Sequence, residues 1–302
     1  MTTNMKTITF LPLTFLLLVS CSSCKPDPEI PETKPQQLNI SILLDLSDRI
    51  DKNLHPFQEQ VDLESIQKII SLFKQQLTEV GVYDAKGKMK IIFYPSPDND
   101  SIISIAKRLS VDFSKADSSS MQGISDKIKM FGAFDTSFMS NVKKLYLSSC
   151  QSKAYPGADI FSFFKDEIDD QCIENDPCYR NILVIVTDGY MYWDKDKTNP
   201  IGNRYTYITP KSIQLTRFRK MKNWESDFDK YDYGFVNVNK KLPDLEVLVW
   251  GIDPTETEDY DIIKKYWEKW FSEMEIKSSK IKIVKTELPI KTNIIENFFQ
   301  KK

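Results

Sequence analysis

The sequence predicts an α/β domain with a doubly wound, mostly parallel sheet and helices on both faces of that sheet. Two nearly continuous apolar runs, 39–44 and 181–186, have the pattern of strands that are buried on both faces. An acidic residue, Asp45 or Asp188, follows each run within two positions. Strand-like and helix-like segments also alternate along the chain, which is typical of a parallel sheet.

The N-terminal segment has the three-part pattern of a secretory signal. Residues 1–20 carry one positive charge and an apolar stretch that is too short to span a membrane. The ending Leu18-Val-Ser-Cys21 resembles a bacterial lipobox, which implies cleavage before Cys21 and lipidation of that cysteine. The alternative is an ordinary signal peptide. Ser22 favours export to the outer membrane, on its periplasmic face or at the cell surface.

The remaining chain divides into a short tether and one domain. Residues 21–37 are rich in proline and predict an extended tether. Residues 38–302 fit a single large α/β domain. The expected strands are 38–45, 88–94, 110–113, 180–186, 244–251 and 281–284. The expected helices are 58–79, 102–109, 118–147 with a break near Gly132, 159–168, 259–274 and 290–299.

The strand ends predict a ligand site. Parallel strands place their carboxyl ends at one edge of the sheet, so we expect Asp45, Ser47 and Asp188 to converge there. Carboxylate and hydroxyl oxygens suit Mg²⁺, Mn²⁺ or Ca²⁺.

These residues resemble the metal-ion-dependent adhesion site of the von Willebrand factor A (vWA) family, a doubly wound, Rossmann-like domain. Asp45 and Ser47 match the first two positions of Asp-x-Ser-x-Ser, and Asp188 lies in the matching Thr-Asp-Gly. Arg49 replaces the second serine, and Ala158 stands in place of the family's threonine. The resemblance implies a divalent ion at Asp45, Ser47 and Asp188, with Asp159 or Asp48 as a substitute ligand. A partner's acidic residue would complete its coordination.

Arg49 opens an alternative to the metal. A guanidinium would repel a cation, and as an internal counter-ion it would pair with Asp188 or Asp159. The domain would then bind its partner without metal.

The segment 190–240 is predicted to be a long insertion at the ligand edge, rich in aromatic residues. It either contributes to function or forms a subdomain that packs on itself. In the helix 259–274, by contrast, Ile263, Trp267, Trp270 and Met274 recur at helical spacing and predict a face packed on the sheet.

The cysteines indicate an oxidising compartment, and a bridge between Cys172 and Cys178 is expected, with Cys150 as an alternative partner. The numbers of basic and acidic residues, 41 and 43, argue against nucleic acid as a partner. Membrane contact is expected through the lipid alone.

The sequence therefore predicts a lipid-anchored envelope protein that binds a protein partner, with or without a divalent ion. A metal-free scaffold of an envelope complex is the main alternative. A Mg²⁺-dependent hydrolase using Asp45 and Asp188 is the enzymatic alternative. An enzyme is not favoured, because the one histidine, His55, is expected in an exposed loop and no Gly-x-Ser-x-Gly motif is present.

Overall fold

The computed structural model describes residues 36–96, 99–152, 158–193 and 200–300. The signal peptide, Cys21 and nearly all of the tether lie outside these residues, as do residues 153–157 of the loop before Ala158. The described residues belong to one compact unit, which runs from Pro35 to Lys302. Within them, no helix has both the length and the apolar character that a membrane span requires.

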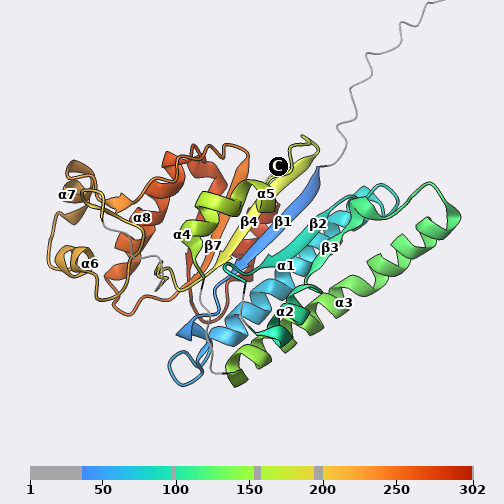
Figure 1. Ribbon diagram of the computed structural model, residues 1–302, viewed down its shortest axis with the longest axis horizontal. Helices are drawn as coiled ribbons and strands as arrows, with labels where there is room; N and C mark the ends of the chain where they lie inside the picture. Colours follow the sequence, from blue (N-terminus) through green and yellow to red (C-terminus); the bar gives the residue numbers. More distant parts are fainter. Residues whose placement is uncertain (1–35, 97–98, 153–157, 194–199, 301–302) are drawn as a thin grey trace, which may run out of the picture. The chain divides into compact units, whose positions relative to one another are not determined.

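The described part of the chain forms a mostly parallel six-stranded sheet in the order β3-β2-β1-β4-β7-β8 (Figure 1). Only β3 runs antiparallel to its neighbour. The strands are β1 (Gln37–Leu44), β2 (Lys88–Ile92), β3 (Ser110–Asp112), β4 (Tyr179–Val186), β7 (Leu245–Ile252) and β8 (Ile281–Lys285). The expected strands are therefore present, with ends that differ by one or two residues.

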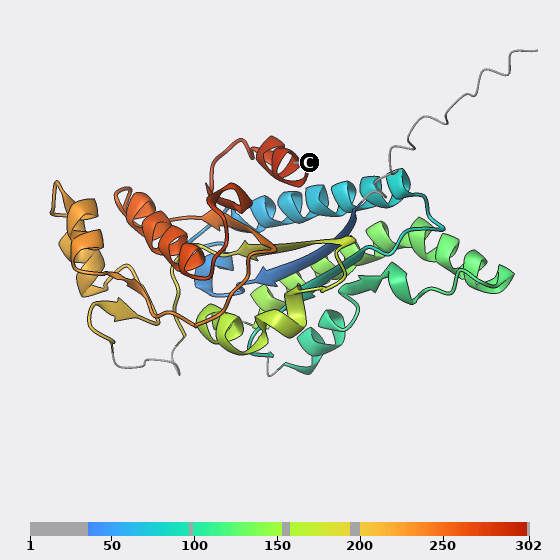
Figure 2. The same ribbon diagram turned by 90° about the horizontal axis from the view of Figure 1, so that it is seen from above.

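Helices cover both faces of the sheet, as Figure 2 shows. The helices connected with the sheet are α1 (Gln58–Val80), α2 (Asp100–Ala106), α3 (Met121–Ser152), α4 (Ile160–Ser162), α5 (Ile168–Cys172), α8 (Asp259–Glu273) and α9 (Thr292–Phe299). Alternate residues of β4 enter different cores: Val184 packs with α1, α3 and α9, whereas Leu183 and Ile185 pack with α4, α5 and α8. The apolar runs of the sequence are thus explained by burial on both sides.

Two expected helices differ from the structure. The helix α3 continues through Gly132 without a break, because this glycine is solvent-exposed and costs an exposed helix only about 1 kcal/mol. The helix expected at 159–168 begins at Ile160 as a single α-helical turn. It then continues through a π-helical segment, Phe163–Glu167, into α5.

The expected disulfide between Cys172 and Cys178 is not formed, and Cys150 is also a free thiol. Cys172, the last residue of α5, is buried in the core, and burial raises the pKa of its thiol to about 12. Cys178 lies in the turn before β4, where its backbone N–H donates to Asp176. The two side chains therefore belong to different environments although only five residues separate them.

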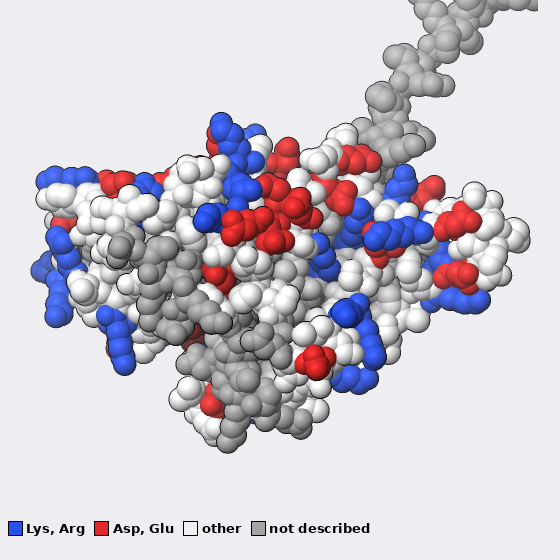
Figure 3. Space-filling model, viewed as in Figure 1, with Lys and Arg blue, Asp and Glu red and all other residues white. Residues whose placement is uncertain are grey.

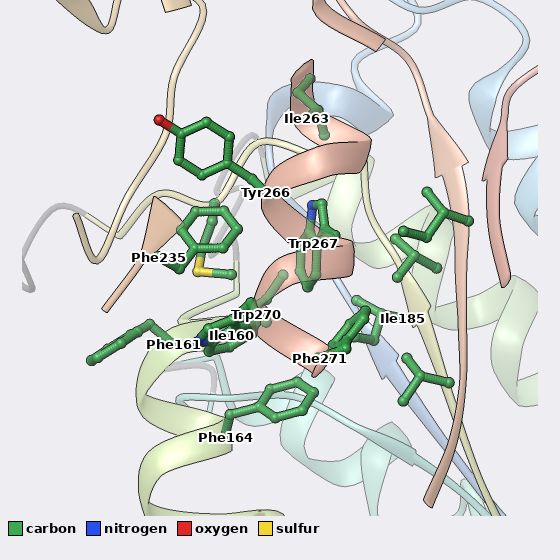
Figure 4. Packing of buried hydrophobic residues seen from close by; sticks show 14 of the residues in the cluster. Ile160, Phe161, Phe164, Ile185, Phe235, Ile263, Tyr266, Trp267, Trp270 and Phe271 are labelled. Carbon is green, nitrogen blue, oxygen red and sulfur yellow. The ribbon is translucent and has the colours of Figure 1, made fainter. Parts of the chain in front are cut away.

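The segment between β4 and β7 packs on α8. It contains β5 (Arg204–Tyr205), α6 (Ile213–Phe218), α7 (Trp224–Lys230) and β6 (Gly234–Phe235), and β5 pairs with β6 in a separate small sheet. Phe235 contacts Trp267 and Trp270 of α8, with ring centroids 5.8 and 5.5 Å apart. Figure 4 shows α8 between Phe235 of this segment and Ile185 of the sheet. The aromatic stripe of α8 is buried as predicted, although its contacts extend to this segment as well as to the sheet.

We expect Trp270→Ala to lower the free energy of unfolding by about 3–5 kcal/mol, because it removes a large buried side chain and leaves a cavity. It also removes the donor to the carbonyl of Val236, 2.9 Å from the indole Nε1. Denaturant unfolding of the full chain measures the loss. Ile213→Ala is the control, since that side chain is 82% exposed and its removal should change stability by less than about 0.5 kcal/mol. A loss below about 1 kcal/mol for Trp270→Ala would contradict the packing described.

Candidate functional site

The carboxyl edge of the sheet brings together residues that follow β1, β4 and β7. Leu44 and Val186 are paired in register, so Asp45 and Thr187 leave the sheet side by side. The hydroxyl of Thr187 donates to Asp45 Oδ2 at 3.2 Å. The backbone N–H of Asp253, just beyond β7, donates to the carbonyl of Asp188 at 3.0 Å. Asp45 and Asp188 therefore follow neighbouring strands at the same edge of the sheet.

Asp45 is a buried carboxyl group whose two oxygens both accept hydrogen bonds. Only 5% of the residue is exposed. Oδ1 accepts from the backbone N–H of Ser47 at 3.0 Å, and Oδ2 accepts from Thr187. Burial raises the pKa of Asp45, while the charge of Arg49 and these hydrogen bonds oppose the increase. The surroundings therefore act against the charged form of this carboxyl group.

Arg49 lies beneath this edge in a buried ion pair with Asp62 of α1. The pair is bidentate: Nη1 is 2.7 Å from Oδ2 and Nη2 is 2.9 Å from Oδ1. Nη1 also donates to the backbone carbonyl of Asp45 at 3.3 Å. Burial acts to lower the pKa of Arg49, but the charge and hydrogen bonds of Asp62, together with Tyr146 and Asp45, outweigh it. The pKa is therefore raised and the guanidinium stays charged. Arg49 is an internal counter-ion, but its partner is Asp62 and not Asp188 or Asp159.

Further side chains complete the hydrogen bonding of Asp62. The hydroxyl of Tyr146, on α3, donates to Oδ2, and the amide of Gln58 donates to Oδ1, each at 2.8 Å. Gln58 in turn accepts from the hydroxyl of Thr286, just beyond β8, at 3.3 Å. The ion pair therefore connects the exit of β1 with α1, α3 and the end of β8.

Gly251 lets β7 pass directly over the guanidinium. Its φ of 90° lies in the left-handed region, which favours glycine. A Cβ at this position would lie 3.1 Å from Nη2 of Arg49 and 3.3 Å from Nε2 of Gln58. A larger residue would therefore strain the backbone and press on the ion pair.

The two other predicted ligands, Asp188 and Asp159, each accept a local hydrogen bond. Oδ1 of Asp188 accepts from the backbone N–H of Tyr190 at 2.9 Å. Oδ1 of Asp159 accepts from the N–H of Ser162 at 2.9 Å and caps α4. Asp159 is held near the end of β2 by its own N–H, which donates to the carbonyl of Tyr94. Ala158, beside it, is buried in the core.

Two residues that the sequence interpretation missed are His55 and Asp253. His55 Nδ1 lies 2.9 Å from Asp253 Oδ2, and 30% and 39% of the two side chains are exposed. Asp253 follows the strand β7 as Asp45 follows β1, so the same strand-end pattern identifies it. Nothing near His55 in the sequence indicates this contact, since the two residues are 198 positions apart.

A third missed feature joins the aromatic segment to α8. Asp259, fully buried at the start of α8, accepts from Arg219 at both oxygens, each at 2.6 Å. The hydroxyl of Tyr190 donates to Oδ2 of the same carboxylate at 2.7 Å. Burial, together with this hydrogen bond, raises the pKa of Tyr190. The network holds the start of the segment against the carboxyl edge.

The residues at this edge fit a divalent cation poorly. Within the described ranges, no group of three or more His, Cys, Asp or Glu residues is arranged to hold a metal ion. Both oxygens of Asp45 already accept from N–H and O–H donors, and the charged guanidinium of Arg49 lies below. A cation there would have to displace these donors and overcome repulsion from Arg49.

The resemblance to the vWA family rests on the sequence motif of Asp45, Ser47 and Asp188 alone. No protein-family model matches the chain, and no curated protein matches it. Membership of the vWA family therefore stays a prediction.

We expect Asp45→Asn to gain stability relative to the natural chain as pH rises. The folded pKa of Asp45 lies above the ordinary value of 3.8, so the folded state binds its proton more tightly than the unfolded state does. Its contribution to stability is present below pH 3.8 and is lost as pH rises through the folded pKa. Asparagine has no such proton. Unfolding of both chains between acid and neutral pH measures the difference, and a difference that stays constant with pH would contradict the raised pKa.

Proposed function

We propose that this chain is a lipid-anchored protein of the cell envelope whose vWA-like domain binds a protein partner without a metal ion. In this proposal residues 1–20 direct export and Cys21 carries the lipid. The protein contacts the membrane through that lipid alone. The segment between β4 and β7 acts as an insertion that supplies contact residues. The doubly wound arrangement of the vWA family is part of the proposal.

The observation that carries the proposal is a tyrosine surface at the start of the insertion, formed by Tyr192, Tyr205 and Tyr207. The ring of Tyr207 contacts the rings of both others, at centroid distances of 6.4 and 6.1 Å. Tyr192 is 41% exposed, whereas Phe218, Phe228 and Phe235 of the same segment are buried. Tyrosine is enriched in protein interfaces, where it supplies both apolar area and a hydrogen bond.

The position of the tyrosine surface connects it with the carboxyl edge. Asp159, at the cap of α4, lines a shallow depression together with Met191, Tyr192 and Thr206. Tyr190, two residues before Tyr192, is held by Asp259. A partner at this surface would meet aromatic rings on a supported backbone, which lowers the entropy lost on binding.

The ion pair of Arg49 and Asp62 is the reason that the proposed binding needs no metal ion. A guanidinium with a bidentate carboxylate partner already supplies the positive charge beside Asp45. In the vWA family a bound divalent ion would supply positive charge at this place. That ion can leave the site, and it takes a carboxylate of the partner as a ligand.

The hydrolase alternative gains little support from the same geometry. A nucleophilic carboxylate must reach its substrate, whereas Asp45 is 5% exposed and its oxygens accept hydrogen bonds from Ser47 and Thr187. The imidazole of His55, which could act as a base, contacts Asp253 and not Asp45.

We expect partner binding to require the tyrosine surface and to survive chelation. The full chain is used to capture proteins from envelope extracts, with and without EDTA. Tyr192→Ala with Tyr207→Ala should abolish a specific capture. Met121→Ala is the control, because Met121 is 85% exposed on a different element, α3. Capture that is lost with EDTA, or that is unchanged in the tyrosine variant, would contradict the proposal.

We also expect no saturable heat of binding when Mg²⁺, Mn²⁺ or Ca²⁺ is titrated into the full chain. The reason is the repulsion between a cation and Arg49. Asp188→Ala serves as the matched variant and should give the same trace as the natural chain. Saturable binding that Asp188→Ala abolishes would establish a metal site and overturn the metal-free part of the proposal.

A further inference from the structure

The strand β8 forms one edge of the described sheet and has a single strand neighbour, β7. The N–H of Thr286 donates to the carbonyl of Ile252, beyond the paired residues. Successive residues of a strand point their backbone groups to opposite edges, so those of Ile283 and Lys285 point away from β7. In agreement, the carbonyl of Ile283 accepts from the side-chain hydroxyl of Tyr260, at a long distance of 3.4 Å. An added strand would replace this long hydrogen bond and pair with the outward backbone groups of Ile283 and Lys285.

A hollow lies along each side of this edge. One, of about 370 Å³, is lined by Trp250, Tyr260, Val284 and the turn after β8. The other, of about 600 Å³, lies against α8 and reaches Ile281. Lys282 and Ile283 line both hollows, so the strand runs between them. Side chains of an added strand would alternate between the two hollows.

The charged side chains of β8 itself are positive, although Glu287 follows in the turn after the strand. The chain as a whole is nearly neutral, and acidic side chains gather near α5 on the face shown in Figure 3. On β8, by contrast, the charged residues are Lys282 and Lys285. Neither forms an ion pair with a described carboxylate, and the ammonium of Lys285 lies over the ring of Tyr260, 5.8 Å from its centroid.

We infer that β8 is a docking site for an extended, acidic segment of a protein partner, which adds to the sheet as a further strand. Its backbone pairs with Ile283 and Lys285, and its carboxylates pair with the two lysines. Because Lys282 and Lys285 are three residues apart, they project from opposite faces of the strand. The partner therefore carries acidic residues three positions apart, with apolar residues between them. This inference concerns a surface separate from the tyrosine surface and does not depend on the proposed function.

The charges also argue against a second copy of this chain as the partner that pairs with β8. Pairing β8 with another β8 would bring lysines into the same interface, and like charges across paired strands are destabilising. Edge lysines commonly protect a sheet from such pairing. Protection and recognition make different predictions for an acidic strand: protection alone gives no binding, whereas recognition gives binding that depends on both lysines.

The test uses the full chain and a labelled peptide with the core Glu-Val-Ile-Glu between neutral residues, followed by fluorescence anisotropy. Lys282→Glu with Lys285→Glu should weaken binding by about tenfold or more, because attraction becomes repulsion. The control is Lys107→Glu with Lys144→Glu, which changes the net charge equally at exposed positions on other elements. A peptide of equal composition with its glutamates two positions apart should also bind more weakly.

Hydrogen exchange provides a readout of the backbone contact. Bound peptide should slow exchange at the amides of Ile283 and Lys285, which face away from β7. Exchange that is unchanged in β8, or equal weakening by the two lysine pairs, would overturn the inference and leave a non-specific attraction between charges. Failure of the peptide to bind at all would also overturn it and leave the lysines a protective role.

Discussion

The buried ion pair between Arg49 and Asp62 is the interaction on which the carboxyl edge depends. It fixes the turn after β1 to α1, and Tyr146 and Gln58 extend its hydrogen bonds to α3 and towards β8. The glycine at 251 allows β7 to lie against the same guanidinium. A buried charge is costly unless it is paired, so each of these elements is held in an arrangement that keeps Arg49 paired with Asp62. The edge is therefore built around a fixed internal charge.

That constraint agrees with a proposed recognition surface that lies away from the strand ends. Asp45 is buried, whereas the chain that follows Asp188 leads to the exposed ring of Tyr192. The bond from Arg219 to Asp259 and the packing of Phe235 on α8 hold the intervening segment in place. The proposed partner surface is thus held by the same domain as the ion pair. Binding at this surface does not require an exchangeable metal ion in place of Arg49.

Sequence reasoning identified the strands, and it placed Asp45 and Asp188 at one edge, because apolar runs and strand-end residues are local signals. It did not identify Asp62 as the partner of Arg49. A single acidic residue on a mostly apolar helix face has no local pattern that identifies its partner across the fold. The contact of His55 with Asp253 was missed for the same reason. The cysteine pairing was wrong because a short spacing does not reveal that one side chain faces the core.

The most direct test of this account is a double-mutant cycle on Arg49 and Asp62. The free energy of unfolding is measured for Arg49→Met, Asp62→Leu and the two together. Each single change should cost about 3–5 kcal/mol, since it leaves one buried charge without its partner. The double change should cost clearly less than the sum of the two. Costs that simply add would show that the pair is not coupled and would contradict the central place given to it.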